Sequence, residues 1–244
     1  PKTVEVAGFV ESAIRKAGVT APLMIMKGDG GVTSMETFRT KPILTILSGP
    51  AASVAGALLY LKVTNGIFVE VGGTSTNICI IKNGKPTIRY VTIKNHPTCI
   101  RSMDVRVLGV AGGSMVKIKS NHIDGVGPRS AHIAGLKYSC YADPEDLRTG
   151  EIIFVKPKES DIDEYAAIKC KNGTYAITNT CAANALKMIE KGDYSFSNQE
   201  SAKIALEILG KKLNVSWSMV ATSIIQTSSF EITKEISKII KEFK

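Results

Sequence analysis

Apolar residues at the start of the chain recur first with the period of a helix and then with that of a strand. Residues 3–17 are predicted to form an amphipathic helix that ends at Gly18, a residue that suits the last position of a helix. An apolar strand is expected over residues 22–27, and it leads into the loop Lys27-Gly28-Asp29-Gly30-Gly31. A strand that opens into a glycine-rich turn is typical of an α/β sheet.

Two further apolar strands flank a turn of glycines and hydroxyl residues. They are predicted over residues 66–71 and 77–82, with Gly72-Gly73-Thr74-Ser75-Thr76 between them. Asn83-Gly84 favours another tight turn, and residues 87–93 alternate as a strand after it. We expect all these strands, including the one at 22–27, to belong to one mixed sheet with helices on both faces.

The pattern changes in the second half of the chain. Residues 142–175 are richer in charge and are expected to form an irregular excursion. A helix is predicted over residues 200–212, with Ser197 as its cap, and helical periodicity continues towards the C-terminus. We therefore expect an α/β lobe over residues 1–195 and a helical segment over residues 196–244 that packs on it.

Composition and charge narrow the class of protein. With 44% hydrophobic residues the chain can form a core, but no apolar run approaches the roughly 20 residues of a membrane-spanning helix, so we expect no membrane insertion. The net charge of +9 is scattered, and only 6% of residues are aromatic. These features argue against nucleic-acid binding and favour an anionic small molecule.

The cysteines and the N-terminal residues indicate the cellular compartment of the protein. The five cysteines form no C-x-x-C pair, so neither a disulfide framework nor a structural zinc site is predicted. No secretory pattern follows Pro1. We expect a reducing, cytoplasmic compartment, and we expect the chain to be a piece of a longer protein.

The turn between residues 72 and 77 carries the clearest chemical signal. Adjacent glycines leave backbone N–H groups accessible, and three hydroxyl groups add further donors, which is the environment that phosphate oxygens require. A Gly-Gly turn between strands can also be purely structural. The hydroxyl cluster and two further glycine-rich loops, at residues 27–31 and 108–114, favour ligand binding.

Six motifs follow one another within residues 20–141, with a weaker seventh at residues 178–184. They are residues 26–31, PILTILSGP at 42–50, EVGGTSTN at 70–77, AGGS at 111–114, GPRSA at 127–131 and Cys140-Tyr141. The ordered set resembles the hydantoinase A and 5-oxoprolinase family, which includes acetone carboxylase subunits. Several motifs in order are more specific than any one of them.

The resemblance implies a ribonuclease-H-like lobe of the actin-like ATPase fold, in which two lobes enclose ATP and each donates a hairpin to its phosphates. Family members use ATP to open a cyclic amide. The resemblance thus implies the ATP-binding part of a cyclic-amide hydrolase, with ATP and magnesium as cofactors. The family's first phosphate hairpin has no counterpart here, so we expect a missing N-terminal lobe, an inactive isolated fragment and, as a further partner, a second subunit.

The resemblance also implies roles for individual residues. The phosphates would be positioned by Gly72, Gly73, Thr74, Ser75 and Thr76, and the sugar or base would face Gly112, Gly113 and Ser114. Magnesium-bound water would be oriented by Glu70 and Asn77. Asp29 and Asn77 are the candidate catalytic residues, although a turn-capping role fits Asp29 equally well.

Some positions depart from the family pattern. Glu70 and Asn77 each stand where the family usually has Asp, and an amide at Asn179 or Asn184 replaces a further carboxylate. An amide cannot ionise and is a poor base. Two alternatives therefore stay open, namely a non-catalytic actin-like module that binds nucleotide or protein, and a carboxylase subunit of the same family.

Overall fold

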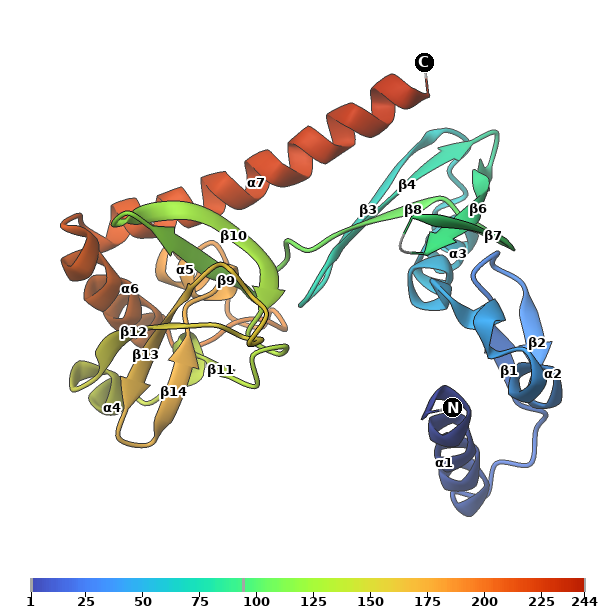
Figure 1. Ribbon diagram of the computed structural model, residues 1–244, viewed down its shortest axis with the longest axis horizontal. Coiled ribbons are helices and arrows are strands. Elements are labelled where there is room, and N and C mark those ends of the chain that lie inside the picture. Colours follow the sequence, from blue (N-terminus) through green and yellow to red (C-terminus); the bar gives the residue numbers. More distant parts are fainter. Residues whose placement is uncertain (1, 94, 244) are drawn as a thin grey trace. The chain divides into compact units, whose positions relative to one another are not determined.

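The computed structural model describes residues 2–93 and 95–243, and these form two compact units of mixed α/β structure (Figure 1). Unit 1 comprises Pro1–Glu70 and Asn77–Arg106, and unit 2 comprises Val71–Thr76 and Val107–Lys244. The tip of one hairpin is thus assigned to unit 2 and its strands to unit 1. Among the described residues no helix has the length and apolar character needed to span a membrane.

The described helices of unit 1 include the one predicted at the N-terminus. This helix, α1, ends before Gly18, which has a positive φ of 84°. Helix α3 packs Ala51 and Val54 against apolar residues of the neighbouring strands and so forms the core of the unit. The bounds are α1 (Lys2–Lys16), α2 (Met35–Thr40), the 3-10 turn η1 (Pro42–Thr45) and α3 (Ser48–Leu61).

The described strands of unit 1 belong to three sheets, so the expectation of one sheet is wrong. β3 and β4 pair as expected and are extended by β5 and β8, but β1 pairs only with β2, and β6 only with β7. The turn at Gly30 places β2 directly beside β1, so these two strands pair with each other. Pro86 has no N–H to donate and lies at the end of the very short β5, so the sheet of β3 and β4 does not continue into β6. The bounds are β1 (Met24–Met26), β2 (Val32–Ser34), β3 (Gly66–Val71), β4 (Thr76–Lys82), β5 (Lys85–Pro86), β6 (Ile88–Ile93), β7 (His96–Met103) and β8 (Val105–Leu108).

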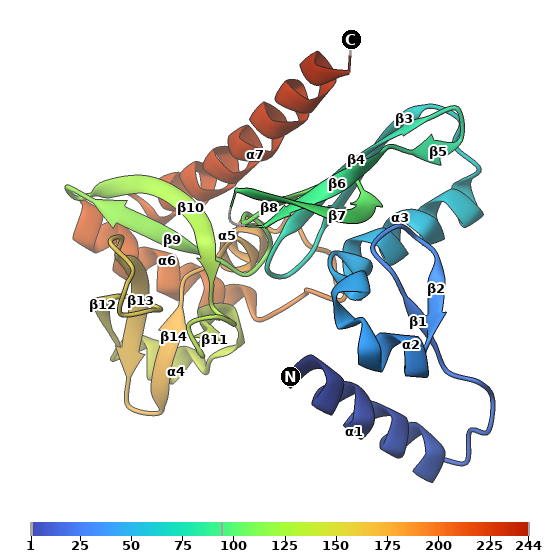
Figure 2. The same cartoon turned by 45° about the vertical axis from the view of Figure 1, so that its right-hand side comes forward.

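A mixed sheet forms the centre of unit 2 (Figure 2). Its six described strands run in the order β10-β9-β13-β14-β11, with β12 paired to β13. The pairing is antiparallel except between β11 and β14. The bounds are β9 (Ser114–Lys119), β10 (His122–Ser130), β11 (Lys137–Tyr138), β12 (Glu151–Val155), β13 (Tyr165–Cys170) and β14 (Gly173–Ala176).

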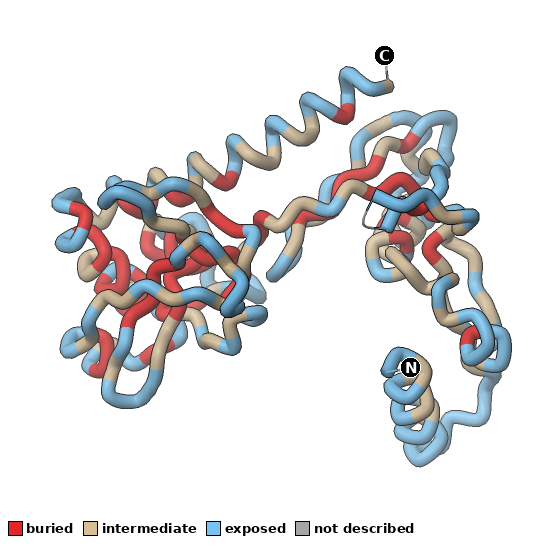
Figure 3. The backbone as a smooth tube through the Cα atoms, in the orientation of Figure 1, coloured by how far each residue is buried: buried red, intermediate tan, exposed pale blue. Residues whose placement is uncertain are grey.

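The helices of unit 2 share a large apolar core with this sheet. α5, α6 and α7 contact one another, and Ile168 and Ile177 from the sheet region are fully buried together with Leu206, Leu209 and Ile224 from the helices. Figure 3 shows this buried interior as the red segments of unit 2. The bounds are η2 (Ser139–Tyr141), α4 (Pro144–Arg148), α5 (Asn179–Ala185), α6 (Gln199–Leu213) and α7 (Trp217–Glu242).

Two expectations for the second half of the chain are corrected. Residues 142–175 are not irregular but contain α4, β12, β13 and most of β14, because their apolar residues enter the core, while the charged loop 156–164 joins β12 to β13. α6 is capped by Asn198 and not by Ser197, since the Asn198 side chain accepts hydrogen bonds from the N–H groups of Glu200 and Ser201. The division of the chain at residue 195 stays a prediction.

Candidate functional site

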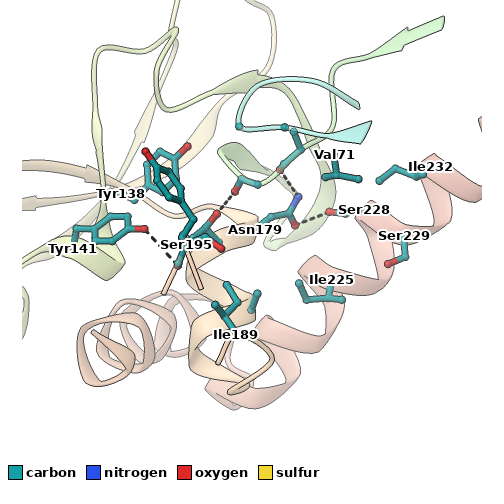
Figure 4. Close-up of a pocket in the computed structure, with 17 residues that line it drawn as sticks. Val71, Tyr138, Tyr141, Asn179, Ile189, Ser195, Ile225, Ser228, Ser229 and Ile232 are labelled. Atoms are coloured by element: carbon teal, nitrogen blue, oxygen red, sulfur yellow. Dashed lines mark hydrogen bonds between the residues drawn. The ribbon is translucent and has the colours of Figure 1, made fainter. Parts of the chain in front are cut away.

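Unit 2 contains a pocket of about 770 Å³ where the tip of the β3–β4 hairpin meets a glycine-rich loop, α5 and α7 (Figure 4). Apolar and aromatic side chains dominate its wall, and none of the described residues that line it carries a charge. The lining residues are Val71, Gly72, Gly73, Ala111, Gly112, Tyr138, Tyr141, Asn179, Thr180, Ala183, Ile189, Tyr194, Ser195, Ile225, Ser228, Ser229 and Ile232.

The hairpin tip is a tight turn with free backbone donors. It is closed by a 3.0 Å hydrogen bond from the N–H of Gly72 to the carbonyl of Ser75. The hydroxyl of Thr76 is fully buried and donates to the carbonyl of Val110 at 2.5 Å, so Thr76 anchors the turn. No described residue accepts a hydrogen bond from the N–H groups of Gly73, Thr74 or Ser75. Three successive N–H groups are therefore available to a ligand.

The glycine-rich loop that follows β8 holds this tip through its backbone. The N–H groups of Gly112 and Gly113 donate to the carbonyls of Gly72 and Gly73 at 3.0 and 2.8 Å. A Cβ atom on Gly113 would lie 2.6 Å from the carbonyl oxygen of Gly73 and would overlap the Tyr138 hydroxyl, so only glycine fits there. Gly112 is one of the residues that line the pocket.

Ser114 lies away from the pocket in the interior of unit 2. It is fully buried, and its hydroxyl accepts a 2.9 Å hydrogen bond from the N–H of Ala111. The same hydroxyl donates to the carbonyl of Gly109 at 3.3 Å. Ser114 thus stabilises the bend of the loop, and a contact between it and a nucleotide stays a prediction.

The start of α5 supports the glycine-rich loop from the other side. The N–H and the hydroxyl of Thr180 both donate to the carbonyl of Gly112, at 2.8 and 2.9 Å. The Asn179 amide donates to the carbonyl of Ala111 at 2.8 Å and accepts a 2.6 Å hydrogen bond from the hydroxyl of Ser228 on α7. Sequence patterns could not indicate Ser228 as a partner of Asn179, because the two residues lie 49 positions apart in the chain.

Aromatic and branched aliphatic residues form the rest of the wall. The rings of Tyr138 and Tyr141 are 6.0 Å apart between centroids, and the Tyr141 hydroxyl donates to the carbonyl of Ser195 at 3.4 Å. Burial raises the pKa of the Tyr138 hydroxyl, and nearby Cys181 and Cys140 act in the same direction. Tyr138 therefore stays a neutral donor at physiological pH. Sequence analysis missed these tyrosines as site residues, although Cys140-Tyr141 was one of the motifs.

Glu70 and Asn77, the predicted magnesium residues, are hydrogen-bonded to each other at the base of the hairpin. The Asn77 amide donates to Glu70 Oε2 at 2.8 Å, and the Ser53 hydroxyl donates to Glu70 Oε1 at 3.0 Å. No group of three or more His, Cys, Asp or Glu side chains with the geometry of a metal site occurs among the described residues. Each Glu70 oxygen thus accepts one hydrogen bond and keeps a second lone pair, and the role of Glu70 and Asn77 towards magnesium-bound water stays a prediction.

Asp29 lies in the loop between β1 and β2 of unit 1. Partial burial raises the pKa of its carboxyl, but the N–H of Gly31 and the ammonium group of Lys27 outweigh this and hold the pKa below its usual range. Both partners are 3.0 Å away. Asp29 thus fulfils the turn-capping role, and its catalytic role stays a prediction.

A family model described as hydantoinase/oxoprolinase matches residues 1–244, the whole length of the chain. The chain belongs to the hydantoinase/oxoprolinase family. Among curated proteins, the alpha subunit of caprolactamase from Pseudomonas jessenii is 26% identical over 126 residues, which is 50% of this chain and 18% of that subunit.

Two solved structures are similar to this hydantoinase/oxoprolinase chain. A nucleotide-free structure of acetone carboxylase, studied for ATP-dependent acetone carboxylation, has a TM-score of 0.70 at 18% identity and covers 95% of the chain. The ATP-dependent caprolactamase from Pseudomonas jessenii has a TM-score of 0.63 at 21% identity and covers 98%. The likeness establishes the actin-like ATPase fold. The chain spans 30% and 31% of those two structures.

Proposed function

We propose that this chain is the ATP-binding part of an ATP-dependent cyclic-amide hydrolase, with the phosphates of the nucleotide at the tip of the β3–β4 hairpin. The observation that carries the proposal is the row of unbonded N–H groups at Gly73, Thr74 and Ser75, beside a pocket that Gly72, Gly73 and Gly112 line. Successive backbone N–H groups bind phosphate oxygens. No acidic side chain among the described lining residues would repel the anion.

The rest of the pocket suits the nucleoside. Its volume of about 770 Å³ lies within the ordinary range for small-molecule sites. The flat rings of Tyr138 and Tyr141 and the side chains of Ile189 and Ile225 offer an apolar surface to a base, while the Tyr138 hydroxyl and the Ser195 backbone are polar groups at its edge. We therefore propose the phosphates at the hairpin and the base at the tyrosines.

The proposed chemistry activates an amide that water attacks slowly. The amide oxygen attacks the terminal phosphorus of ATP, the bond from that phosphorus to the bridging oxygen breaks, and ADP leaves. Water then adds to the activated carbonyl carbon, the C–N bond breaks as the nitrogen takes up a proton, and the ring opens to an acyl phosphate. A second water hydrolyses the acyl phosphate to a carboxylate and inorganic phosphate. In this scheme the N–H groups of the hairpin hold the triphosphate in line, and Asp29 remains a candidate catalytic residue.

The first prediction tests the phosphate site. Gly73→Val is expected to weaken ATP binding about tenfold or more, because the new side chain enters the space beside the free N–H groups. Folding should be nearly unchanged, since Gly73 is exposed, has no positive φ, and a Cβ there meets only the Tyr138 hydroxyl, at 4.0 Å. Calorimetric titration of ATP with the full chain and a melting curve measure the two effects. Unchanged ATP affinity would reject the phosphate site.

The second prediction concerns the exposed hydroxyl of the tip. Thr74→Ala removes one candidate donor and should cost about 1 kcal/mol of ATP binding, close to a fivefold rise in Kd. Thr76→Ala is the contrasting variant, because the Thr76 hydroxyl is already bonded to Val110. That variant should lower the melting temperature more than Thr74→Ala does. Equal melting temperatures and equal ATP affinities would contradict the distinction.

Two other functions each have an observation in their favour. The amides at Asn77 and Asn179 favour a non-catalytic nucleotide-binding module, and the similarity to acetone carboxylase favours a carboxylase subunit. One assay separates them: ATP hydrolysis by the enzyme containing this chain, with a lactam, with acetone and bicarbonate, or with neither. We expect hydrolysis only with the lactam, and negligible turnover by the 244 residues alone, because phosphoryl transfer needs groups on both sides of the nucleotide and the chain spans 30% and 31% of the two similar structures.

A further inference from the structure

The hydroxyl of Tyr138 is free to bind a ligand. Among the described residues none forms a hydrogen bond with it, whereas the hydroxyls of Tyr141, Tyr165 and Tyr175 each donate to an oxygen of the protein. Tyr138 is half-buried and lines the pocket (Figure 4). A polar group in a largely apolar wall is costly to leave unpaired, so this hydroxyl favours a ligand that accepts or donates a hydrogen bond.

The fold fixes the position of this hydroxyl. The ring of Tyr138 packs against both apolar clusters of unit 2, and its backbone pairs with Ala176 at the end of β11. The hydroxyl lies against Gly113, where any Cβ atom would overlap it. Gly113 therefore leaves the room that the hydroxyl occupies, and the N–H of Gly113 also donates to the carbonyl of Gly73 in the hairpin tip.

The hydroxyl consequently lies beside the free N–H groups of the tip. A Cβ atom on Gly73 would be 4.0 Å from the Tyr138 oxygen, so a group bound at the N–H of Gly73 is within reach of both. Burial raises the pKa of Tyr138, and the hydroxyl therefore stays protonated at physiological pH and donates to an anion instead of repelling it. A hydrogen bond from a neutral donor to an anion is stronger than one between neutral groups.

We infer that Tyr138 is a further binding residue of the phosphate site, and that its hydroxyl donates a hydrogen bond to a phosphate oxygen of the nucleotide. The inference rests on the proposed phosphate site at the hairpin tip. None of the described residues that line the pocket carries a charge, so a side-chain hydroxyl adds a donor where no cationic side chain is present. The ring of Tyr138 still offers its apolar surface to the base, and one side chain thus serves two parts of the nucleotide.

Tyr138→Phe tests the inference, because it removes the hydroxyl and keeps the ring. ATP and inorganic tripolyphosphate are titrated calorimetrically against the full chain in the same magnesium buffer. The variant should bind each ligand about tenfold more weakly than the wild type, as expected for the loss of one hydrogen bond to a charged group. Its melting temperature without ligand should not fall, since the hydroxyl has no partner in the protein to lose.

Tyr175→Phe is the matched control on the neighbouring strand β14. The Tyr175 hydroxyl donates to Asp146 at 3.4 Å, and Tyr175 is not one of the residues that line the pocket. Its removal should lower the melting temperature slightly and leave the affinities for ATP and tripolyphosphate unchanged. The two variants are therefore expected to separate ligand affinity from stability in opposite directions.

Each other outcome has a defined meaning. Equal tripolyphosphate affinities of the wild type and Tyr138→Phe overturn the inference, and a loss confined to ATP assigns the hydroxyl to the nucleoside instead of the phosphates. A melting temperature of Tyr138→Phe that falls as far as that of Tyr175→Phe also overturns it, because the hydroxyl would then be bonded within the protein. A wild-type chain that binds neither ligand rejects the phosphate site of the proposed function itself, and the role of Tyr138 with it.

Discussion

Gly113→Ala is expected to lower the free energy of unfolding by about 3 kcal/mol and to abolish the proposed ATP binding, although it adds a single methyl group. The new Cβ atom would overlap the Tyr138 hydroxyl and lie 2.6 Å from the carbonyl oxygen of Gly73. The hairpin tip must then move away, and the bonds from Gly112 and Gly113 to the tip are lost. Urea unfolding and ATP titration measure the two effects.

Two glycine variants serve as controls for Gly113→Ala. Gly73→Ala adds the same methyl group on the other side of the contact, where it meets only the Tyr138 hydroxyl at 4.0 Å, and should fold normally. Gly56→Ala lies inside α3 with nothing within 4 Å of the new atom, and should stabilise the chain by about 1 kcal/mol. If Gly113→Ala is as stable as Gly73→Ala, the glycine-rich loop does not hold the hairpin.

Asn179→Asp, which places a carboxylate where an amide now lies, is expected to destabilise this chain by about 3 kcal/mol at neutral pH. The Asn179 amide nitrogen donates to the carbonyl of Ala111, and a carboxylate in its place would face that carbonyl oxygen with like charge. The site is only 8% exposed, so water cannot screen the repulsion. Ser228 would still donate to the other oxygen.

The effect of Asn179→Asp depends on pH in a defined direction. A protonated acid can donate to Ala111 as the amide does, so the pKa of the new carboxyl is raised in the folded state. Stability close to that of the wild type is therefore present below the unfolded pKa of about 3.9 and is lost as the pH rises through the folded-state value. Urea unfolding between acidic and neutral pH measures this.

Ser228→Ala is the matched control for the pH profile. It removes the hydroxyl that donates to Asn179 Oδ1 and introduces no titrating group, so it should lower stability by about 1 kcal/mol at every pH. A stability difference for Asn179→Asp that does not change with pH would show that the side chain at position 179 does not face the carbonyl of Ala111.

Sequence patterns predicted the individual helices and strands of this chain better than they predicted how the strands pair into sheets. The apolar runs at 66–71 and 77–82 correspond to β3 and β4, and the first helical period to α1, because periodicity reports which face of one element is buried. The stretch 142–175 was misjudged because its charged loop masked buried strands on either side. The pairing of β1 with β2 depends on how one turn closes, which periodicity does not encode.

The sequence by itself determined the family, the mixed α/β fold and the glycine-hydroxyl turn as the candidate phosphate site, since ordered motifs and adjacent glycines are local properties of the chain. Only the tertiary structure decided which groups of that site are free. It brought Ser228 to Asn179 and Ser53 to Glu70, and it left the N–H groups of Gly73, Thr74 and Ser75 without acceptors. The physical reason is that a hydrogen bond between distant residues needs both partners at about 3 Å with opposite polarity, and the folded chain alone sets that distance.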